Sequence, residues 1–237
     1  MKPGLSIIIT TYNEEKNIEP TVRAVLKALE VNEITDYELL LVDKRGWDKT
    51  QEVIDRLAEQ NSHIIAVHHL KNRDFRGLGH QYRVTVQRAT KQYVAWIPGD
   101  DETSHESIVK VFGCLGKAEI ILPYTENTEM RSLRRRFLSK FYTMVLNLLF
   151  SNHIRYYNGI NIFPTAEVKK INITSNRHAY MAEIVIKLLN KKISYYETGI
   201  KINPTEQSSA IQFKNITDVA KMALKLFWQL RIKRIKS

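Results

Sequence analysis

Three groups of polar side chains stand out because each follows a short apolar segment typical of a buried strand. Thr11, Tyr12 and Glu14 follow the segment 5–10, Asp43 and Asp48 follow the segment 37–42, and Asp100, Asp101 and Glu102 follow the segment 93–97. An aromatic ring and carboxylates suit a nucleobase and its ribose. Hard cations such as Mg²⁺ take oxygen ligands and bridge phosphates through one or two protein carboxylates. The three groups therefore predict a nucleotide site with a divalent metal.

Strand-like and helix-like segments alternate through the first half of the chain. Strands are expected at 5–10, 37–42, 63–69 and 93–97, with helices beginning near residues 17, 48 and 77. This alternation predicts an α/β fold with a mainly parallel sheet flanked by helices. Ligands bind beyond the carboxyl ends of strands in such sheets, so the polar groups should meet at one edge. An acidic residue after a strand is also a common helix N-cap, and Asp48 fits that structural role equally well.

The second half is less regular and more basic. Helices are expected at 107–115, 133–150 and 180–190. Strands are expected at 119–122, at 156–163 with an interruption at Asn158 and Gly159, and at 193–202. The last segment predicts an amphipathic helix with lysines and arginines on its polar face. In the second half, Arg131, Arg135, Arg136 and Lys140 lead into the apolar stretch 141–150.

Charge and cysteine content exclude several classes of protein. Lys and Arg number 36 against 25 Asp and Glu, a net charge of +11, and residues 1–60 carry only 8 basic against 12 acidic side chains. The basic excess therefore lies in residues 61–237, where no nucleic-acid-binding motif accompanies it. The single cysteine excludes a disulfide framework. The longest uncharged apolar run, 141–154, is shorter than the roughly 17–25 residues that span a bilayer, so we expect a cytoplasmic protein.

Five segments, in order, carry a family pattern. They are SIIITTYNEEKNIEPTVRAVL, LLLVDKRGWDKTQEVIDRLA, RGLGHQYRVTVQRATKQYVAWIPGDDE, LRRRFLSKFYTMVLNLLF with YYNGINIF, and YMAEIVIKLLNKKISYYETGIKINP. They resemble family 2 glycosyltransferases of the GT-A fold, most of all the branch of dolichol-phosphate mannose synthase and related polyprenyl-phosphate sugar transferases. The resemblance implies a GT-A domain at 1–212, with a nucleotide-sugar-binding half at 1–103 and an acceptor half at 104–212. A basic amphipathic helix at 213–237 would follow it.

The resemblance also implies roles for single residues. Asp100 would be the ligand that ends the family's Asp-x-Asp motif, with Glu102 as a second ligand for Mg²⁺ or Mn²⁺. We expect Thr11, Tyr12, Glu14, Asp43 and Asp48 to bind the nucleotide. We expect Asp100, Asp101 and Glu183 to be catalytic, Glu183 because related enzymes place an acidic residue near the acceptor.

Four departures from the family pattern concern the donor and metal sites and the acceptor side. Pro98 replaces the first Asp of Asp-x-Asp, which removes one metal ligand. Lys44 replaces the second carboxylate of the usual Asp-Asp-Gly-Ser, and this cation could instead meet the diphosphate. Thr10 replaces the usual proline, and Thr205 with Glu206 stands where polyprenyl-phosphate branches often carry an arginine.

The implied reaction is an inverting transfer from a UDP- or GDP-linked sugar. A lipid phosphate acceptor is already anionic and needs cations to hold it. Arg131, Arg135, Arg136 and Lys140 beside an apolar helix fit such a headgroup at the inner face of a membrane, and the C-terminal helix fits a second contact. In the structural alternative both helices pack on the core and their charges are solvated.

Two functional alternatives stay open. A glycan hydroxyl as acceptor would need a general base, for which Glu183, Asp101 and His178 are candidates. A nucleotide-binding relative that has lost catalysis is the other alternative.

Overall fold

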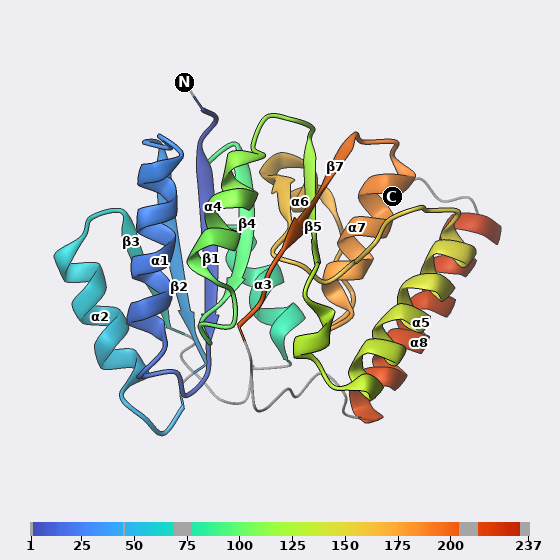
Figure 1. The fold of residues 1–237 in the computed structure, drawn as a ribbon, viewed down its shortest axis with the longest axis horizontal. Helices are drawn as coiled ribbons and strands as arrows, with labels where there is room; N and C mark the ends of the chain where they lie inside the picture. The colour runs from blue at the N-terminus through green and yellow to red at the C-terminus, as the bar shows by residue number, and fades with distance from the viewer. Residues whose placement is uncertain (1, 45, 69–76, 204–212, 233–237) are drawn as a thin grey trace.

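The computed structural model describes residues 2–44, 46–68, 77–203 and 213–232, which form a seven-stranded sheet with helices on both faces (Figure 1). The strands are β1 Leu5–Thr11, β2 Tyr37–Asp43, β3 Ile64–His68, β4 Tyr93–Pro98, β5 Ile120–Thr125, β6 Ile162–Pro164 and β7 Tyr195–Ile200. The helices are α1 Ile18–Val31, α2 Thr50–Gln60, α3 Leu78–Val86, α4 His105–Gly113, α5 Leu133–Phe150, α6 Thr165–Lys170, α7 Tyr180–Asn190 and α8 Phe213–Phe227. A 3-10 turn, Thr128–Met130, precedes α5, and a π-helical turn, Trp228–Ile232, extends α8.

The sheet register brings the three polar groups to one edge. The strand order is β3-β2-β1-β4-β6-β5-β7, and β1 runs parallel to both of its neighbours. Thr11 pairs with Asp43, and Thr10 pairs with Pro98. Because neighbouring strands lie about 4.8 Å apart, the segments that leave β2 and β4 are separated by about 10 Å across the end of β1.

Two apolar cores, one on each face of the sheet, hold these strands rigidly. Ile8, Leu40 and Val94 pack under α3, α6, α7 and α8, whereas Ile7 and Leu39 pack under α1, α2 and α4. All five side chains are at most 1% exposed. Strands buried on both faces have nearly continuous apolar sequences, as the segments 5–9 and 39–42 do.

The strand expected at 156–163 is mostly a loop, and this expectation was wrong. Only Ile162–Pro164 forms a strand, which pairs with β4 in the antiparallel direction, and the short helix α6 follows it unpredicted. A Cβ atom at Gly159 would lie 2.5 Å from a carbonyl oxygen of β5. The buried Asn161 side chain donates a hydrogen bond to the Tyr157 carbonyl at 3.0 Å. These local contacts favour a turn over an extended strand.

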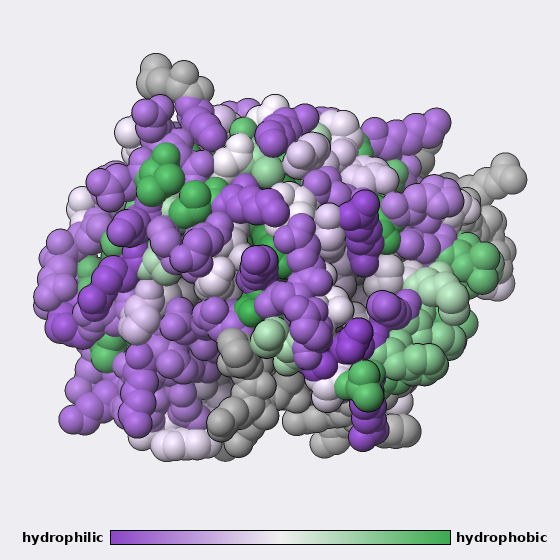
Figure 2. Space-filling view, in the orientation of Figure 1, coloured by the Kyte–Doolittle hydropathy of each residue, from purple (hydrophilic) through white to green (hydrophobic). Residues whose placement is uncertain are grey.

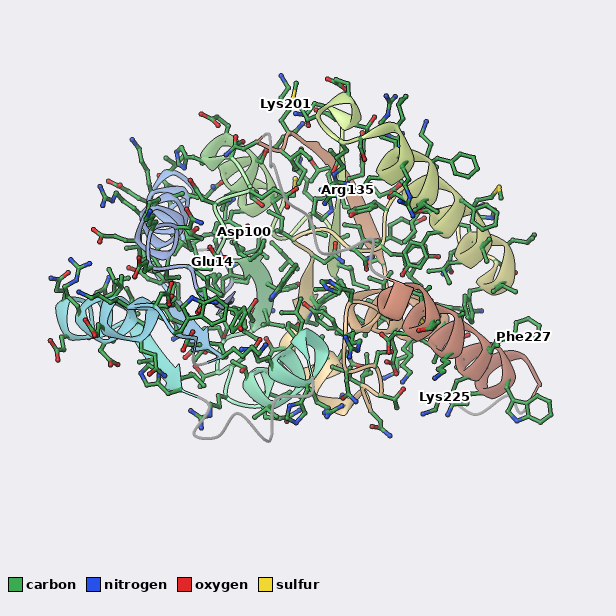
Figure 3. All side chains as sticks on the ribbon, turned by 90° about the horizontal axis from the view of Figure 1, so that it is seen from below. Glu14, Asp100, Arg135, Lys201, Lys225 and Phe227 are labelled. Carbon is green, nitrogen blue, oxygen red and sulfur yellow. The ribbon has the colours of Figure 1, made fainter. Side chains whose placement is uncertain are left out.

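The C-terminal amphipathic helix is present as α8, which packs beside α5 (Figures 1 and 3). Residues 233–237 lie outside the described residues, as do Thr205 and Glu206. Among the helices that the structure describes, none is long and apolar enough to cross a membrane. The proposed boundaries at residues 103 and 212 stay predictions.

Candidate functional site

A cavity of about 850 Å³ opens at the carboxyl ends of β1 and β4. Polar residues that follow these strands line one side, and α5, α8 and the loops beside them line the other. Figure 3 labels Glu14 and Asp100 near the strand ends and Arg135 on α5. Ligand pockets typically measure about 300–1,000 Å³, so this cavity can hold a small-molecule substrate.

The loops after β1 and β2 hold each other through hydrogen bonds. Asp48 accepts from the Glu15 backbone N–H at 3.0 Å and from the Thr50 hydroxyl at 2.6 Å. The Thr50 hydroxyl oxygen in turn accepts from the Glu14 backbone N–H at 2.8 Å. Asp48 is not a cavity-lining residue. It therefore shapes the loop that carries Glu14, as a structural carboxylate would, and its contact with nucleotide stays a prediction.

Tyr12 presents an aromatic face at the cavity, with a cation on it. Its side chain is 42% exposed, and the Nζ atom of Lys44 lies 3.9 Å from the ring centroid. The Trp47 ring packs edge-on against the Tyr12 ring, with centroids 5.6 Å apart. The Trp47 backbone N–H donates a hydrogen bond to the Asn13 side-chain oxygen at 3.0 Å. Burial lowers the pKa of Lys44. Exposed aromatic rings of this kind can stack a nucleobase.

Asp43 lies fully buried beneath the edge of the cavity. The Thr11 hydroxyl donates to its Oδ1 atom at 3.1 Å, and Thr11 itself lines the cavity. The next residue back, Thr10, accepts a hydrogen bond from the indole N–H of Trp96 at 3.1 Å, which a proline at this position could not do. Asp43 is not itself a lining residue, so its direct contact with a nucleobase stays a prediction.

The residues that follow β4 differ in where they lie. Asp100 and Glu102 line the cavity, whereas Asp101 is exposed outside the lining, with a φ angle of 56°. Although Asp100 is exposed to the cavity, desolvation by surrounding atoms raises its pKa, as do the charges of Glu102 and Asp101. Desolvation also raises the pKa of Glu14, and the charge of Asp100 adds to this effect. Two mutually repelling carboxylates at the cavity favour a cationic or hydrogen-bonding ligand between them.

The residues after β4 do not fit a divalent metal held by two carboxylates. Pro98 supplies no ligand atom, and the Asp100 Oδ1 atom accepts the Glu102 backbone N–H at 3.1 Å. The Glu102 Oε1 atom lies 3.5 Å from the Arg135 guanidinium, whose charge repels a second cation. Among the described residues, no group of three or more His, Cys, Asp or Glu side chains is arranged to hold a metal ion.

The wall opposite the strand ends carries arginines. Ser132 caps α5 by accepting the Arg135 backbone N–H, and this start of the helix sets which side chains face the cavity. Arg131 and Arg135 line the cavity, whereas Arg136 is half-buried outside it and Lys140 is exposed outside it. The structure therefore brings two of the four cations expected at an acceptor phosphate to the cavity.

Glu183 is fully buried and is not a lining residue. Its carboxylate accepts the Ser175 backbone N–H at 2.8 Å, the Thr174 backbone N–H at 3.0 Å and the Lys187 ammonium at 2.7 Å. Burial by itself raises the pKa of Glu183, but Lys187 and the backbone donors outweigh it, and the pKa is below its usual value. This environment gives Glu183 a structural role, and its catalytic role stays a prediction without geometric support.

The loop that Glu183 anchors reaches the cavity a few residues further on. Arg177 and His178 both line the cavity from this loop. Burial lowers the pKa of His178, and so does the nearby charge of Arg177, although Asp218 opposes this effect. The lowered pKa favours the neutral form of the His178 imidazole, which is the form that can accept a proton.

The end of the cavity away from the strands is apolar. Its lining includes Leu138, Tyr142, Val145 and Leu146 of α5 and Val219 and Ala223 of α8. The outer surface of α5 is apolar as well, and it appears in Figure 2 as a green strip along the right-hand edge. This outer stripe consists of Leu133, Phe137, Phe141, Met144 and Leu148, which are 52% to 81% exposed, and Phe141 also borders the cavity.

The sequence interpretation missed Trp47, Tyr142 and Arg177. Tyr142 had a usable signal, because it stands four residues from both Leu138 and Leu146 on one face of a helix. Arg177 had none, since its position depends on the loop that Glu183 holds through Thr174 and Ser175.

Comparisons with known proteins place this arrangement in a family. A family model described as "Glycosyl transferase family 2" matches residues 6–165, more than half of the 237 residues. The "Low-salt glycan biosynthesis hexosyltransferase Agl6" of Haloferax volcanii is 21% identical over 89% of this chain and 50% of its own length. The "Undecaprenyl-phosphate 4-deoxy-4-formamido-L-arabinose transferase" of Photorhabdus laumondii is 38% identical over 30% of this chain and 21% of its own length. The chain thus spans half or less of these two relatives.

Solved structures share the fold at low sequence identity. Glucosyl-3-phosphoglycerate synthase from Mycobacterium tuberculosis, in complex with Mg²⁺ and uridine diphosphate, superposes with a TM-score of 0.68 at 11% identity. The match covers 93% of this chain and 79% of that one. A complex of the same enzyme with Mn²⁺, uridine diphosphate and phosphoglyceric acid gives a TM-score of 0.66 at 12% identity, over 93% of this chain and 78% of that one. The expected α/β fold of GT-A type is confirmed.

Proposed function

Because this chain belongs to glycosyltransferase family 2, we propose that it transfers a sugar from a UDP- or GDP-linked donor to a polyprenyl or dolichyl phosphate at the inner face of a membrane. The observation that carries this proposal is the two-part cavity, whose polar end continues into an apolar end between α5 and α8. A lipid phosphate has the same division between headgroup and chain. The undecaprenyl-phosphate transferase among the relatives supports this class of acceptor.

The donor occupies the polar end in this proposal. The rings of Tyr12 and Trp47 offer a stacking surface for the base, and Thr11 offers a hydroxyl that Asp43 orients. Glu14 and Asp100 line the cavity, and in this proposal they accept hydrogen bonds from hydroxyl groups of the ribose and the sugar. The Mg²⁺ or Mn²⁺ expected from the sequence stays a prediction, and no step of the proposed reaction depends on it.

The reaction exchanges one bond at the anomeric carbon. A phosphate oxygen of the acceptor forms a bond to C1 as the bond from C1 to the diphosphate breaks, and the electron pair leaves with the diphosphate. Attack from the opposite side inverts C1. The attacking oxygen is anionic at neutral pH, so no general base is required. Arg131 and Arg135 both line the cavity, and in this proposal Arg131 holds the acceptor phosphate through charge-assisted hydrogen bonds.

A membrane contact follows from the two faces of α5. Its inner face lines the apolar end of the cavity, while its outer stripe is exposed and flanked by exposed Arg134 and Lys140. Exposed Lys221 and Lys225 lie on α8, the helix that packs beside α5. An apolar stripe bordered by cations suits the boundary between anionic headgroups and acyl chains. Such docking would let the lipid enter the cavity directly from the bilayer.

A screen of UDP- and GDP-sugars with undecaprenyl and dolichyl phosphate tests the proposal. We expect one radiolabelled donor sugar to appear in the organic phase as a lipid-linked product, and none with Asp100→Asn. Product with sugar hydroxyl acceptors but none with lipid would contradict the proposed acceptor. Nucleotide binding without any product would identify a catalytically impaired relative.

A glycan hydroxyl acceptor is the second candidate, and His178 favours it. This neutral imidazole lines the cavity and could remove the hydroxyl proton. His178→Ala should abolish transfer to a hydroxyl acceptor but preserve transfer to a lipid phosphate, so the same variant separates the two functions.

A further inference from the structure

The cavity is lined by cations, and Pro98 removes one of the two carboxylates of an Asp-x-Asp metal site beside it. Four cationic residues, Lys44, Arg131, Arg135 and Arg177, line it beside three carboxylates, Glu14, Asp100 and Glu102. Glu102 lies against Arg135, and Pro98 stands where a further ligand would be needed. Side chains therefore place positive charge at the cavity, with one more cation than carboxylates in its lining.

Lys44 and Arg135 approach the strand ends from two sides. Lys44 follows β2, Asp100 follows β4, and β1 lies between them, so both stand at the same sheet edge. The Lys44 ammonium rests on the Tyr12 ring, on the nucleotide side of the cavity. Arg135 reaches the residues after β4 from α5 and touches Glu102 at 3.5 Å. A diphosphate held near Asp100 would lie between these two cations.

We propose, resting on the proposed function, that Lys44 and Arg135 together bind the donor diphosphate, so that nucleoside diphosphate binding in this protein requires no divalent metal. The Arg135 contact with Glu102 is longer than the roughly 2.7–2.9 Å of a charge-assisted hydrogen bond, and a guanidinium has five N–H donors, so donors remain for phosphate. Lys44 exchanges its contact with an aromatic face for a stronger contact with an anion. Both cations keep their protons while the leaving diphosphate receives the electron pair from C1.

Calorimetric titration of UDP and GDP into the full chain tests this proposal, first with EDTA and then with MgCl₂ or MnCl₂. We expect one nucleotide to bind with the same affinity in all three solutions. Lys44→Met should weaken that affinity about tenfold or more. Lys117→Met is a matched control, because the Lys117 ammonium also rests on a tyrosine ring, that of Tyr196, at 4.8 Å and away from the cavity lining. Its nucleotide affinity should be unchanged.

Arg135→Gln supplies a second test, because nucleotide binding by this variant should depend on metal, whereas binding by the wild-type chain should not. It removes a cation from the diphosphate and frees Glu102 from its guanidinium partner, so nucleotide affinity should fall in EDTA and recover in part with Mn²⁺. Electron paramagnetic resonance of free Mn²⁺ should detect more bound ion with Arg135→Gln than with the wild-type chain.

The outcomes separate the two proposals. Nucleotide binding that appears only with metal, or equal affinity for Lys44→Met and the wild-type chain, would overturn metal-independent binding and leave the proposed transferase intact. No binding of either nucleotide with or without metal would overturn both.

Discussion

Glu183 and Asp100 both carry carboxylates, but their surroundings differ and point to different roles. Glu183 has no exposed surface and accepts from two backbone N–H groups and Lys187. Asp100 faces the cavity, where neighbouring carboxylates disfavour its charge. Removing one partner of a buried ion pair destabilises a fold, whereas a disfavoured charge at a cavity is typical of a functional group.

Glu183→Gln should lower the free energy of unfolding by about 3 kcal/mol, because it removes the buried carboxylate partner of Lys187. Transfer activity per folded molecule should persist. Since the pKa of Glu183 is lower in the folded chain, its contribution is present above the unfolded pKa and is lost as pH falls through the folded value. Urea unfolding at several pH values measures both effects. Glu167 is 28% exposed and pairs with Lys170 and Lys191 near the surface, and it offers the control Glu167→Gln, which should change stability by about 1 kcal/mol or less. Full stability with lost transfer would restore a catalytic role to Glu183.

Asp100→Asn should reduce the transfer rate by about 100-fold or more, the typical effect of removing one preorganised electrostatic contact. The melting temperature should stay the same or rise, because desolvation and neighbouring carboxylates disfavour the charge that the substitution removes. Initial rates and thermal unfolding measure the two effects. Retained transfer would remove Asp100 from the reaction.

Helix α5 has two apolar faces with different partners. One lines the cavity beside α8, and the other is the outer stripe, which the described part of the chain leaves exposed. Side chains three or four residues apart lie on one face of a helix, so residues 133, 137, 141, 144 and 148 form a continuous surface. Exposed apolar surfaces of this kind mark interaction sites.

The double variant Phe137→Ser with Leu148→Ser should weaken binding to anionic lipid vesicles about tenfold or more, because each apolar side chain contributes roughly 1.5–3 kcal/mol when buried. Its unfolding free energy should change little, since both side chains are 70% or more exposed. Vesicle sedimentation measures the binding. Val31→Ser is the control, because Val31 is 55% exposed on α1, and its variant should bind vesicles normally. Unchanged sedimentation of the double variant would exclude the outer stripe from membrane contact.

The charge of the whole molecule is distributed unevenly between the predicted nucleotide site and the helices α5 and α8. The acidic excess of residues 1–60 includes much of the predicted nucleotide site, whereas the basic excess of residues 61–237 includes the cations on α5 and α8. A basic region beside an apolar stripe attracts an anionic surface and orients the molecule on it.

Vesicle binding should require anionic lipid and weaken as salt rises, because charges are screened over about 10 Å at 0.1 M ionic strength. The apolar contribution should persist at high salt, so binding should decline to a plateau above that of the double variant. Sedimentation over a salt series measures the decline. Equal binding to neutral and anionic vesicles would show that charge plays no part.

The strands, the helices and the meeting of three polar groups at one edge could be predicted from the sequence because they depend on local patterns. Apolar runs of strand length and apolar residues at helical spacing are properties of neighbouring residues. The position of Asp43 and Asp100 at strand ends then follows from the parallel sheet. Even the basic helix α5 was found with its observed bounds of Leu133–Phe150.

Only the tertiary structure decided which members of these groups face the cavity. Arg135 lines it and Arg136 does not, because each residue turns the helix by about 100° and the packing of α5 sets its rotation. Hydrogen bonds with Ser175 and Lys187 hold Glu183 away from the cavity, and segment 156–161 forms a loop where Gly159 packs against the Pro123 carbonyl of β5. Such outcomes depend on partners that come together only when the chain folds, so local patterns do not contain them.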